Sequence, residues 1–102
     1  MTGYVRGQLT GTGNGTPIDG ATDIDLIVSG TFTATLKLEV ATADATGADT
    51  YVQLGADITA PTVVNVKMAD KHKWRVRCSA FTSGVAVFEL FGSINLQLHA
   101  AP

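Results

Sequence analysis

The chain has 102 residues, of which 45% are hydrophobic and 16% are charged, and its formal net charge is −2. This length fits a single domain with one hydrophobic core. The acidic balance argues against nucleic acid as a partner, because nucleic-acid binding requires a basic surface. No apolar run reaches the ~20 residues of a membrane-spanning helix, so a membrane is not expected as a partner either.

The chain begins with a short alternating run, residues 4–10, followed by the glycine-rich segment 11–20. Glycine and turn residues leave this segment without an apolar face, so it is predicted to be a flexible loop. We therefore divide the chain into an N-terminal arm (1–10), a flexible loop (11–20) and a β-sandwich domain (21–102). The arm carries too little apolar surface to fold alone, and we expect it to be disordered until it pairs with a neighbour.

Alternation of apolar and polar residues dominates the remaining chain and predicts β-strands. In residues 31–40, an apolar face alternates with a polar face, and the apolar face consists of Phe32, Ala34, Leu36, Leu38 and Val40. In residues 73–81, the expected core side consists of Trp74, Val76, Cys78 and Ala80. The basic residues Lys73, Arg75 and Arg77 lie opposite and are interpreted as a solvated strand face. Shorter runs cover residues 23–28, 51–54, 63–68, 85–91 and 94–98.

Together with residues 4–10, these runs amount to about eight short strands at even spacing, which is typical of a sandwich or barrel. Ser29-Gly30 and Thr82-Ser83-Gly84 separate neighbouring runs, as tight turns do. No segment has an apolar period of 3.6 residues. The predicted fold is therefore all-β, an antiparallel, jelly-roll-like β-sandwich with little or no helix.

Residues 85–91 are apolar on both sides of the predicted strand. Val85, Val87 and Phe91 face one way, and Ala86, Phe88 and Leu90 face the other. A strand with two apolar faces is covered twice, by the core and by a second sheet or subunit. Together with the arm, this strand supplies the candidate protein-interface residues, which are Tyr4, Val5, Arg6, Val85, Val87 and Phe91.

Residues able to perform chemistry are few and scattered. Cys78 is the only cysteine and lies in the predicted core stripe, so no internal disulfide is possible. His72 and His99 are far apart, and zinc needs further ligands that the chain does not offer. No nucleophile, base and acid recur in a recognisable arrangement. We expect neither an enzyme nor a bound cofactor.

Two weaker alternatives stay open from the residues alone. Asp19, Asp23 and Asp25 form an acidic cluster in which carboxylates could partly converge on calcium. Turn chemistry explains such aspartates equally well. An exposed Tyr4 or Tyr51 could stack on a sugar ring, which is the usual mode of carbohydrate-binding sandwiches.

Three segments resemble a known group of proteins. They are Ser29-Gly30-Thr31-Phe32-Thr33 with the alternating run after it, Tyr51-Val52-Gln53-Leu54-Gly55, and the run from Lys73-Trp74-Arg75-Val76 to Phe81-Thr82-Ser83-Gly84. Over residues 29–92 this pattern resembles the small β-sandwich virion proteins of tailed bacteriophages. The loop at residues 44–49 departs from the Asp-Gly-Gly type of turn found in related chains.

The resemblance implies a bacteriophage structural protein in the virion, assembled in the host cytoplasm. It implies a capsid decoration, or cement, protein that binds the major capsid protein or another virion protein and stabilises the shell by adhesion. Such proteins cluster at symmetry axes, so a homo-oligomer is expected and a homotrimer is favoured. The alternative within the same setting is a tail or fibre component with a carbohydrate-binding role.

Overall fold

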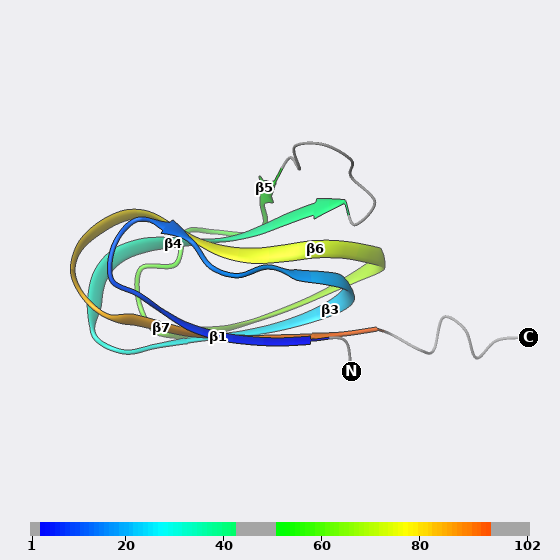
Figure 1. The fold of residues 1–102 in the computed structure, drawn as a ribbon, viewed down its shortest axis with the longest axis horizontal. Helices are drawn as coiled ribbons and strands as arrows, with labels where there is room; N and C mark the ends of the chain where they lie inside the picture. The colour runs from blue at the N-terminus through cyan, green and yellow to red at the C-terminus, as the bar shows by residue number, and fades with distance from the viewer. Residues whose placement is uncertain (1–2, 43–50, 95–102) are drawn as a thin grey trace, which may run out of the picture.

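The computed structural model describes residues 3–42 and 51–94, and within these residues every regular element is a β-strand (Figure 1). The strands are β1 (Gly3–Leu9), β2 (Gly13–Asn14), β3 (Ile18–Ser29), β4 (Phe32–Thr42), β5 (Val52–Gln53), β6 (Thr62–Gly84) and β7 (Ala86–Ser93). All strand pairs are antiparallel. The predicted all-β antiparallel fold is confirmed, whereas its jelly-roll detail stays a prediction. The predicted strand at residues 94–98 lies, from residue 95 onward, outside the described residues.

The seven strands form one sheet in the order β1-β7-β3-β6-β4-β5, with β2 paired to β6. This sheet curls over on itself into two layers (Figure 1). The lower layer contains β1, β7, residues 23–29 of β3 and residues 62–67 of β6. The upper layer contains residues 72–84 of β6 with β4, β5 and β2. Two layers of one continuous sheet therefore enclose the core.

Strand β6 runs through both layers, although its pattern predicts two strands at 63–68 and 73–81. No glycine or proline interrupts residues 69–72, so the backbone stays extended between them. Between the pairs Ala21–His72 and Asp23–Lys67, β3 advances two residues while β6 advances five. The extra residues form a large bulge, and such an irregularity bends a strand. This bend carries β6 from the lower layer to the upper one.

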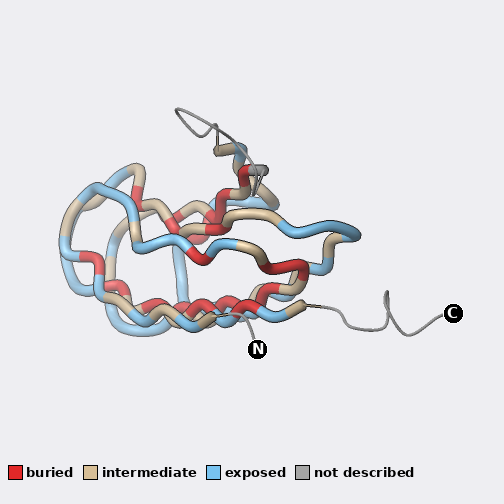
Figure 2. The backbone as a smooth tube through the Cα atoms, turned by 45° about the vertical axis from the view of Figure 1, so that its right-hand side comes forward, coloured by how far each residue is buried: buried red, intermediate tan, exposed pale blue. Residues whose placement is uncertain are grey.

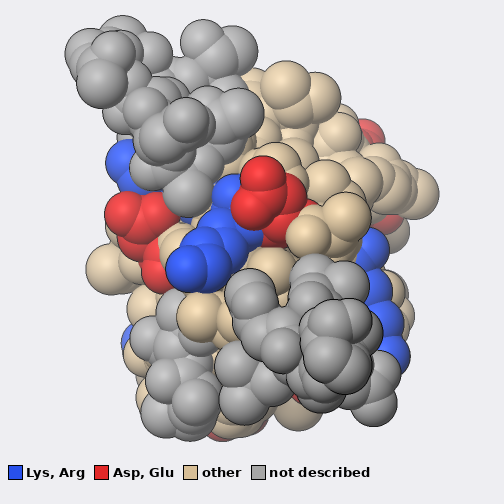
Figure 3. Space-filling model, turned by 90° about the vertical axis from the view of Figure 1, so that its right-hand side faces the viewer, with Lys and Arg blue, Asp and Glu red and all other residues tan. Residues whose placement is uncertain are grey.

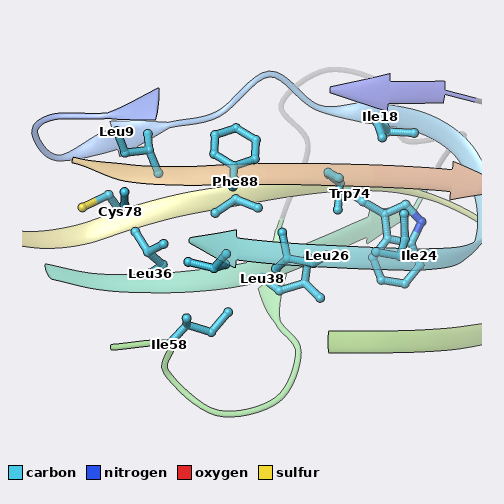
Figure 4. Close-up of a cluster of buried hydrophobic side chains, with 14 of the residues drawn as sticks. Leu9, Ile18, Ile24, Leu26, Leu36, Leu38, Ile58, Trp74, Cys78 and Phe88 are labelled. Atoms are coloured by element: carbon cyan, nitrogen blue, oxygen red, sulfur yellow. The ribbon is translucent and has the colours of Figure 1, made fainter. Parts of the chain in front are cut away.

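The core lies between the layers and takes side chains from both (Figure 4). Along the strands, buried positions alternate with exposed or half-buried ones, as Figure 2 shows. Trp74 is completely buried, and its indole Nε1 donates a hydrogen bond to the carbonyl of Ala21 at 3.0 Å. Leu36 and Leu38 of β4 are buried in the same core, as the alternation predicts. A buried indole N–H with a partner avoids the cost of an unsatisfied donor.

Ala80 was predicted to lie on the core side of its strand, and this prediction is wrong. Cys78 pairs with Leu36 and Ala80 pairs with Thr35, so Ser79 is an extra residue in β6. This bulge reverses the alternation, because one added residue moves every later side chain to the opposite face. Ala80 is consequently exposed, while Phe81 packs against the core.

The N-terminal residues also differ from the predicted disordered arm. All seven residues of β1 pair with β7, and Leu9 belongs to the core with 8% of its surface exposed. Within the predicted loop, β2 pairs with β6 and the Gly15 amide donates to the Val76 carbonyl at 2.7 Å. A Cβ atom on Gly7 would lie 2.8 Å from the Phe88 ring. Because Gly7 has no side chain, β1 packs directly over this ring and joins the sheet.

The position of β1 leads to a stability prediction. Replacing Leu9 by Ala should lower the free energy of unfolding by about 2–3 kcal/mol, because a buried side chain is removed from a packed core. Replacing its exposed neighbour Gln8 by Ala should change it by less than about 0.5 kcal/mol. Urea unfolding of both variants measures the difference. Equal stability of the two variants would show that residues 3–9 contribute nothing to the folded body.

Candidate interaction surface

The side of the lower layer that faces away from the core carries an unusual set of side chains. Ala86, Phe88 and Leu90 of β7 are buried, so Val87, Glu89 and Phe91 lie on the outer side of the same strand. The register extends this side over the neighbouring strands. We call the following residues the outer lower face: Tyr4, Arg6, Asp25, Ile27, Val63, Asn65, Val87, Glu89 and Phe91.

Two rows of cross-strand neighbours make up most of this face. The first row runs across the strands through Tyr4, Phe91, Asp25 and Asn65. The second row runs through Arg6, Glu89, Ile27 and Val63. Side chains directly opposite each other on one face are in contact range, so each row is a continuous ladder.

Tyr4 lies at one end of the first row and is held by two neighbours. Its ring packs on the Phe91 ring with centroids 4.8 Å apart, and its hydroxyl donates to Glu89 Oε2 at 3.1 Å. Desolvation, the hydrogen bond to Glu89 and the negative charge of Glu89 together raise the pKa of the Tyr4 hydroxyl above its ordinary value. Tyr4 therefore stays neutral at physiological pH and presents an ordered aromatic ring.

The outer lower face mixes apolar and charged side chains, because Phe91 and Ile27 on the central strands β7 and β3 stand beside Glu89 and Asp25. Tyr4 is 45% exposed, Val63 is 61% exposed and Phe91 is 36% exposed, while Ile27 and Val87 are half-buried. At the other end of the first row, Asn65 Nδ2 donates to Asp25 Oδ1 at 2.5 Å. Aromatic residues and arginine are enriched at protein interfaces.

The structure brings together four of the six predicted interface residues. Tyr4, Arg6, Val87 and Phe91 all lie on the outer lower face. Val5 is wrong as an interface residue, because it points inward and packs against the core. Ile27, Val63 and Asn65 were missed, although the alternation at residues 23–28 and 63–68 already separated them from the core-facing positions.

Val85, the sixth predicted interface residue, lies in the turn between β6 and β7 rather than within a strand. It is 37% exposed, and its amide donates to the Thr31 carbonyl at 2.9 Å. Val85 is therefore accessible in this turn and does not belong to either of the two ladders.

The outer side of the upper layer has a different character, because it carries a compact ionic cluster. Arg75 Nε donates to Glu39 Oε1 at 2.8 Å and Arg77 Nε donates to Glu39 Oε2 at 3.1 Å. The Glu39 side chain is only 8% exposed. Arg75 and Arg77 are thus paired with Glu39, whereas their sequence pattern indicated a solvated strand face. The Arg75 guanidinium also covers the Tyr51 ring at 3.7 Å from its centroid.

A second ionic group lies beside this cluster. Lys37 Nζ donates to Asp57 Oδ1 at 2.7 Å and to Gln53 Oε1 at 3.1 Å, and Gln53 Nε2 donates to the same Asp57 oxygen. The hydrogen bonds from Lys37 and Gln53 lower the pKa of Asp57 below its ordinary value. On the end of the molecule that Figure 3 presents, acidic and basic side chains likewise lie next to one another outside the grey atoms.

Within residues 3–42 and 51–94, no group of three or more His, Cys, Asp or Glu side chains is placed to hold a metal ion. Asp25 accepts the Asn65 hydrogen bond, and Asp23 accepts one from the Thr22 hydroxyl at 3.1 Å. His72 packs edge-on to Trp74. His99 lies outside the described residues. The described part of the chain contains no helix that is long and apolar enough to cross a membrane.

Comparison of the chain with protein-family models, with curated proteins and with solved structures gives no match. The surfaces described above are therefore interpreted from their own geometry.

The Glu39 cluster predicts that a single substitution of similar shape, Glu39→Gln, markedly lowers the stability of the fold. Replacing Glu39 by Gln keeps the shape but leaves Arg75 and Arg77 without their carboxylate, so the free energy of unfolding should fall by about 2 kcal/mol. Replacing Thr33 by Ala, at an exposed position of the same strand, should change it by less than about 0.5 kcal/mol. Thermal or urea unfolding measures both, and an unchanged Glu39→Gln variant would contradict a structural role for the cluster.

The pKa of Asp57 predicts the direction of a pH effect. Because this pKa is lower in the folded protein than in the unfolded chain, the Lys37–Asp57 contact stabilises the fold above the ordinary aspartate pKa. That stabilisation is lost as the pH falls through the folded-state pKa. Replacing Lys37 by Met should raise the pKa of Asp57 toward its ordinary value, as followed by carboxyl NMR titration. An unshifted titration of Asp57 would mean that Lys37 does not set it.

Proposed function

We propose that this protein is a non-catalytic structural protein of a bacteriophage virion, and that it acts as a capsid decoration protein that adheres to the coat shell. The observation that carries the proposal is the outer lower face, where Tyr4, Phe91 and Val63 expose aromatic and aliphatic surface on a regular sheet.

The face suits adhesion because its side chains are held in place before binding. Each one stands on a strand whose opposite side is packed in the core, and the Tyr4 ring is fixed by Phe91 and Glu89. Ordering these groups on binding therefore costs little conformational entropy. The exposed apolar side chains would lose water on contact, and charged side chains such as Arg6 and Asp25 would orient the partner.

The virion setting rests on the resemblance of residues 29–92 to small phage virion proteins. In that setting the partner is the major capsid protein or another virion protein, and the protein acts as a homo-oligomer, for which three copies around a threefold axis are favoured. Several copies on a symmetric shell bind together, so a modest contact per copy gives stable attachment. The charged fraction of 16% supports this reading, because few charges need to be desolvated on such a surface.

The proposal predicts which variant loses attachment. Replacing both Tyr4 and Phe91 by Ala should reduce binding to purified particles by at least about tenfold, since aromatic hot-spot residues each contribute 1–2 kcal/mol or more. The matched control is Val52→Ala, because Val52 is 61% exposed but lies on β5 in the other layer. Co-sedimentation with particles measures binding, and quantitative mass spectrometry measures copies per particle. One or a few copies per particle would contradict decoration and favour a tail role.

Carbohydrate binding by a tail or fibre component is the second candidate, and one observation favours it. The exposed Tyr4 ring lies in the same row as Asp25 and Asn65, so a stacking surface and hydrogen-bonding groups are near each other. Tyr51 is a poorer candidate, because Arg75 covers its ring. A glycan array probed with the wild-type protein and with Tyr4→Ala separates the two functions. Binding that depends on Tyr4 would support the carbohydrate role, and an array without hits would remove it.

A further inference from the structure

The lower layer ends at an edge of β6 that has no strand partner among the described residues. Residues 62–67 pair with β3 on one side only, and β4 begins to pair with β6 at His72. The hydrogen bonds between backbone groups outside the strand ladders do not involve residues 62–71 either. A row of unpaired N–H and C=O groups on an edge strand is a template for another strand.

The core-facing side chains of this edge strand are apolar and incompletely covered. Val64, Val66 and Met68 pack against the core but are only half-buried. By contrast, Leu26 and Leu90, on the central strands of the same layer, are fully buried. The core is therefore less well covered along this edge than at the centre of the layer, and an added strand would complete it.

We propose that residues 62–68 pair with the same residues of a second copy, antiparallel and about a twofold axis at Asn65. Each copy contributes its four-stranded lower layer, β1-β7-β3-β6, so the two layers join into one continuous sheet. Val63 and Asn65 also belong to the outer lower face, but the pairing uses the backbone groups of the edge, so the inference does not depend on the phage setting.

The sequence of the edge is complementary to itself in this register. Val64 lies opposite the partner copy's Val66, and the two Asn65 amides lie opposite each other. A register shifted by two residues in one direction would bring in Pro61, which has no N–H to donate. A shift in the other direction would use residues 69 and 70 of the large bulge, where β6 leaves its regular pairing with β3.

The charges fit the same arrangement. Lys67 is the only charged residue in residues 62–68, and the proposed register places it opposite the partner copy's Val63. The two Lys67 side chains then lie about four residues apart along the strand direction, roughly 13 Å, where their repulsion is largely screened. A second copy can therefore pair with this edge without placing like charges opposite each other. The contact is smaller than a standard interface of about 1,600 Å², so the dimer is a weak one that forms at high protein concentration.

Substitutions at Val63 test the register in both directions. Val63 is 61% exposed, so replacing it disturbs the folded monomer little. Val63→Glu places a carboxylate opposite Lys67 at two symmetric positions and should strengthen self-association about fivefold. Val63→Lys places like charges there and should weaken it about fivefold. Sedimentation equilibrium over a wide concentration range measures the dissociation constant, with thermal unfolding as the check on folding.

Two controls distinguish this contact from a general effect of charge. Gln8→Glu and Gln8→Lys change the charge at the opposite edge of the same layer and should leave self-association unchanged. The double variant Val63→Lys with Lys67→Glu restores opposite charges across the twofold axis, so it should recover the dimer that Val63→Lys weakens.

The outcomes are separable. A monomer at all concentrations, or equal effects of both Val63 variants, would overturn the proposal. A trimer whose formation does not respond to the Val63 variants, without any dimer, would overturn it as well, because a twofold edge contact cannot close a ring of three. A dimer that responds to Val63 but not to Gln8 supports it, whatever the result of the particle-binding experiment with Tyr4 and Phe91.

Discussion

The passage of β6 through both layers is the constraint on which the rest of this structure depends. Its first part pairs with β3 and its second part with β4, so a single strand holds the two layers at a fixed separation. Trp74 lies just after the bend, and its hydrogen bond to Ala21 ties β6 to the start of β3. This arrangement stabilises a small protein with few strands, because the two layers share one continuous network of backbone hydrogen bonds and do not meet only through side chains.

The same bend creates the surfaces that can interact with other molecules. Since β6 leaves the lower layer at the bulge, residues 62–67 remain an edge with one strand partner among the described residues, and the layer beside it presents an accessible outer side. On the upper layer, the buried carboxylate of Glu39 is neutralised by Arg75 and Arg77, so that side is occupied by its own ion pairs. Apolar surface is thus available on the lower layer, whereas the upper layer satisfies its charges internally.

Much of the fold could be predicted because strand formation is read from local alternation. The apolar face of β4 and the inward side of β7 follow directly from a period of two residues. The same period marked residues 4–10 as a strand but did not reveal that this strand belongs to the folded body. Gly3 and Gly7 weaken its apolar signal, yet the lack of a side chain at Gly7 is what allows β1 to lie close to the Phe88 ring. Four of the six predicted interface residues share the outer lower face, whereas Val5 packs against the core, because β1 is a strand with an inner side.

The sequence by itself determined the class of fold, the apolar faces of most strands and the scarcity of groups able to perform chemistry, because these properties reside in residue types and their local period. Only the tertiary structure decided that residues 62–84 form one bent strand. It also decided that the Ser79 bulge turns Ala80 away from the core and Phe81 toward it. It also decided which residues become neighbours, such as Tyr4 with Phe91 and Glu39 with Arg75. Register between distant strands sets these contacts, and register arises from the packing of the whole sheet rather than from any one segment.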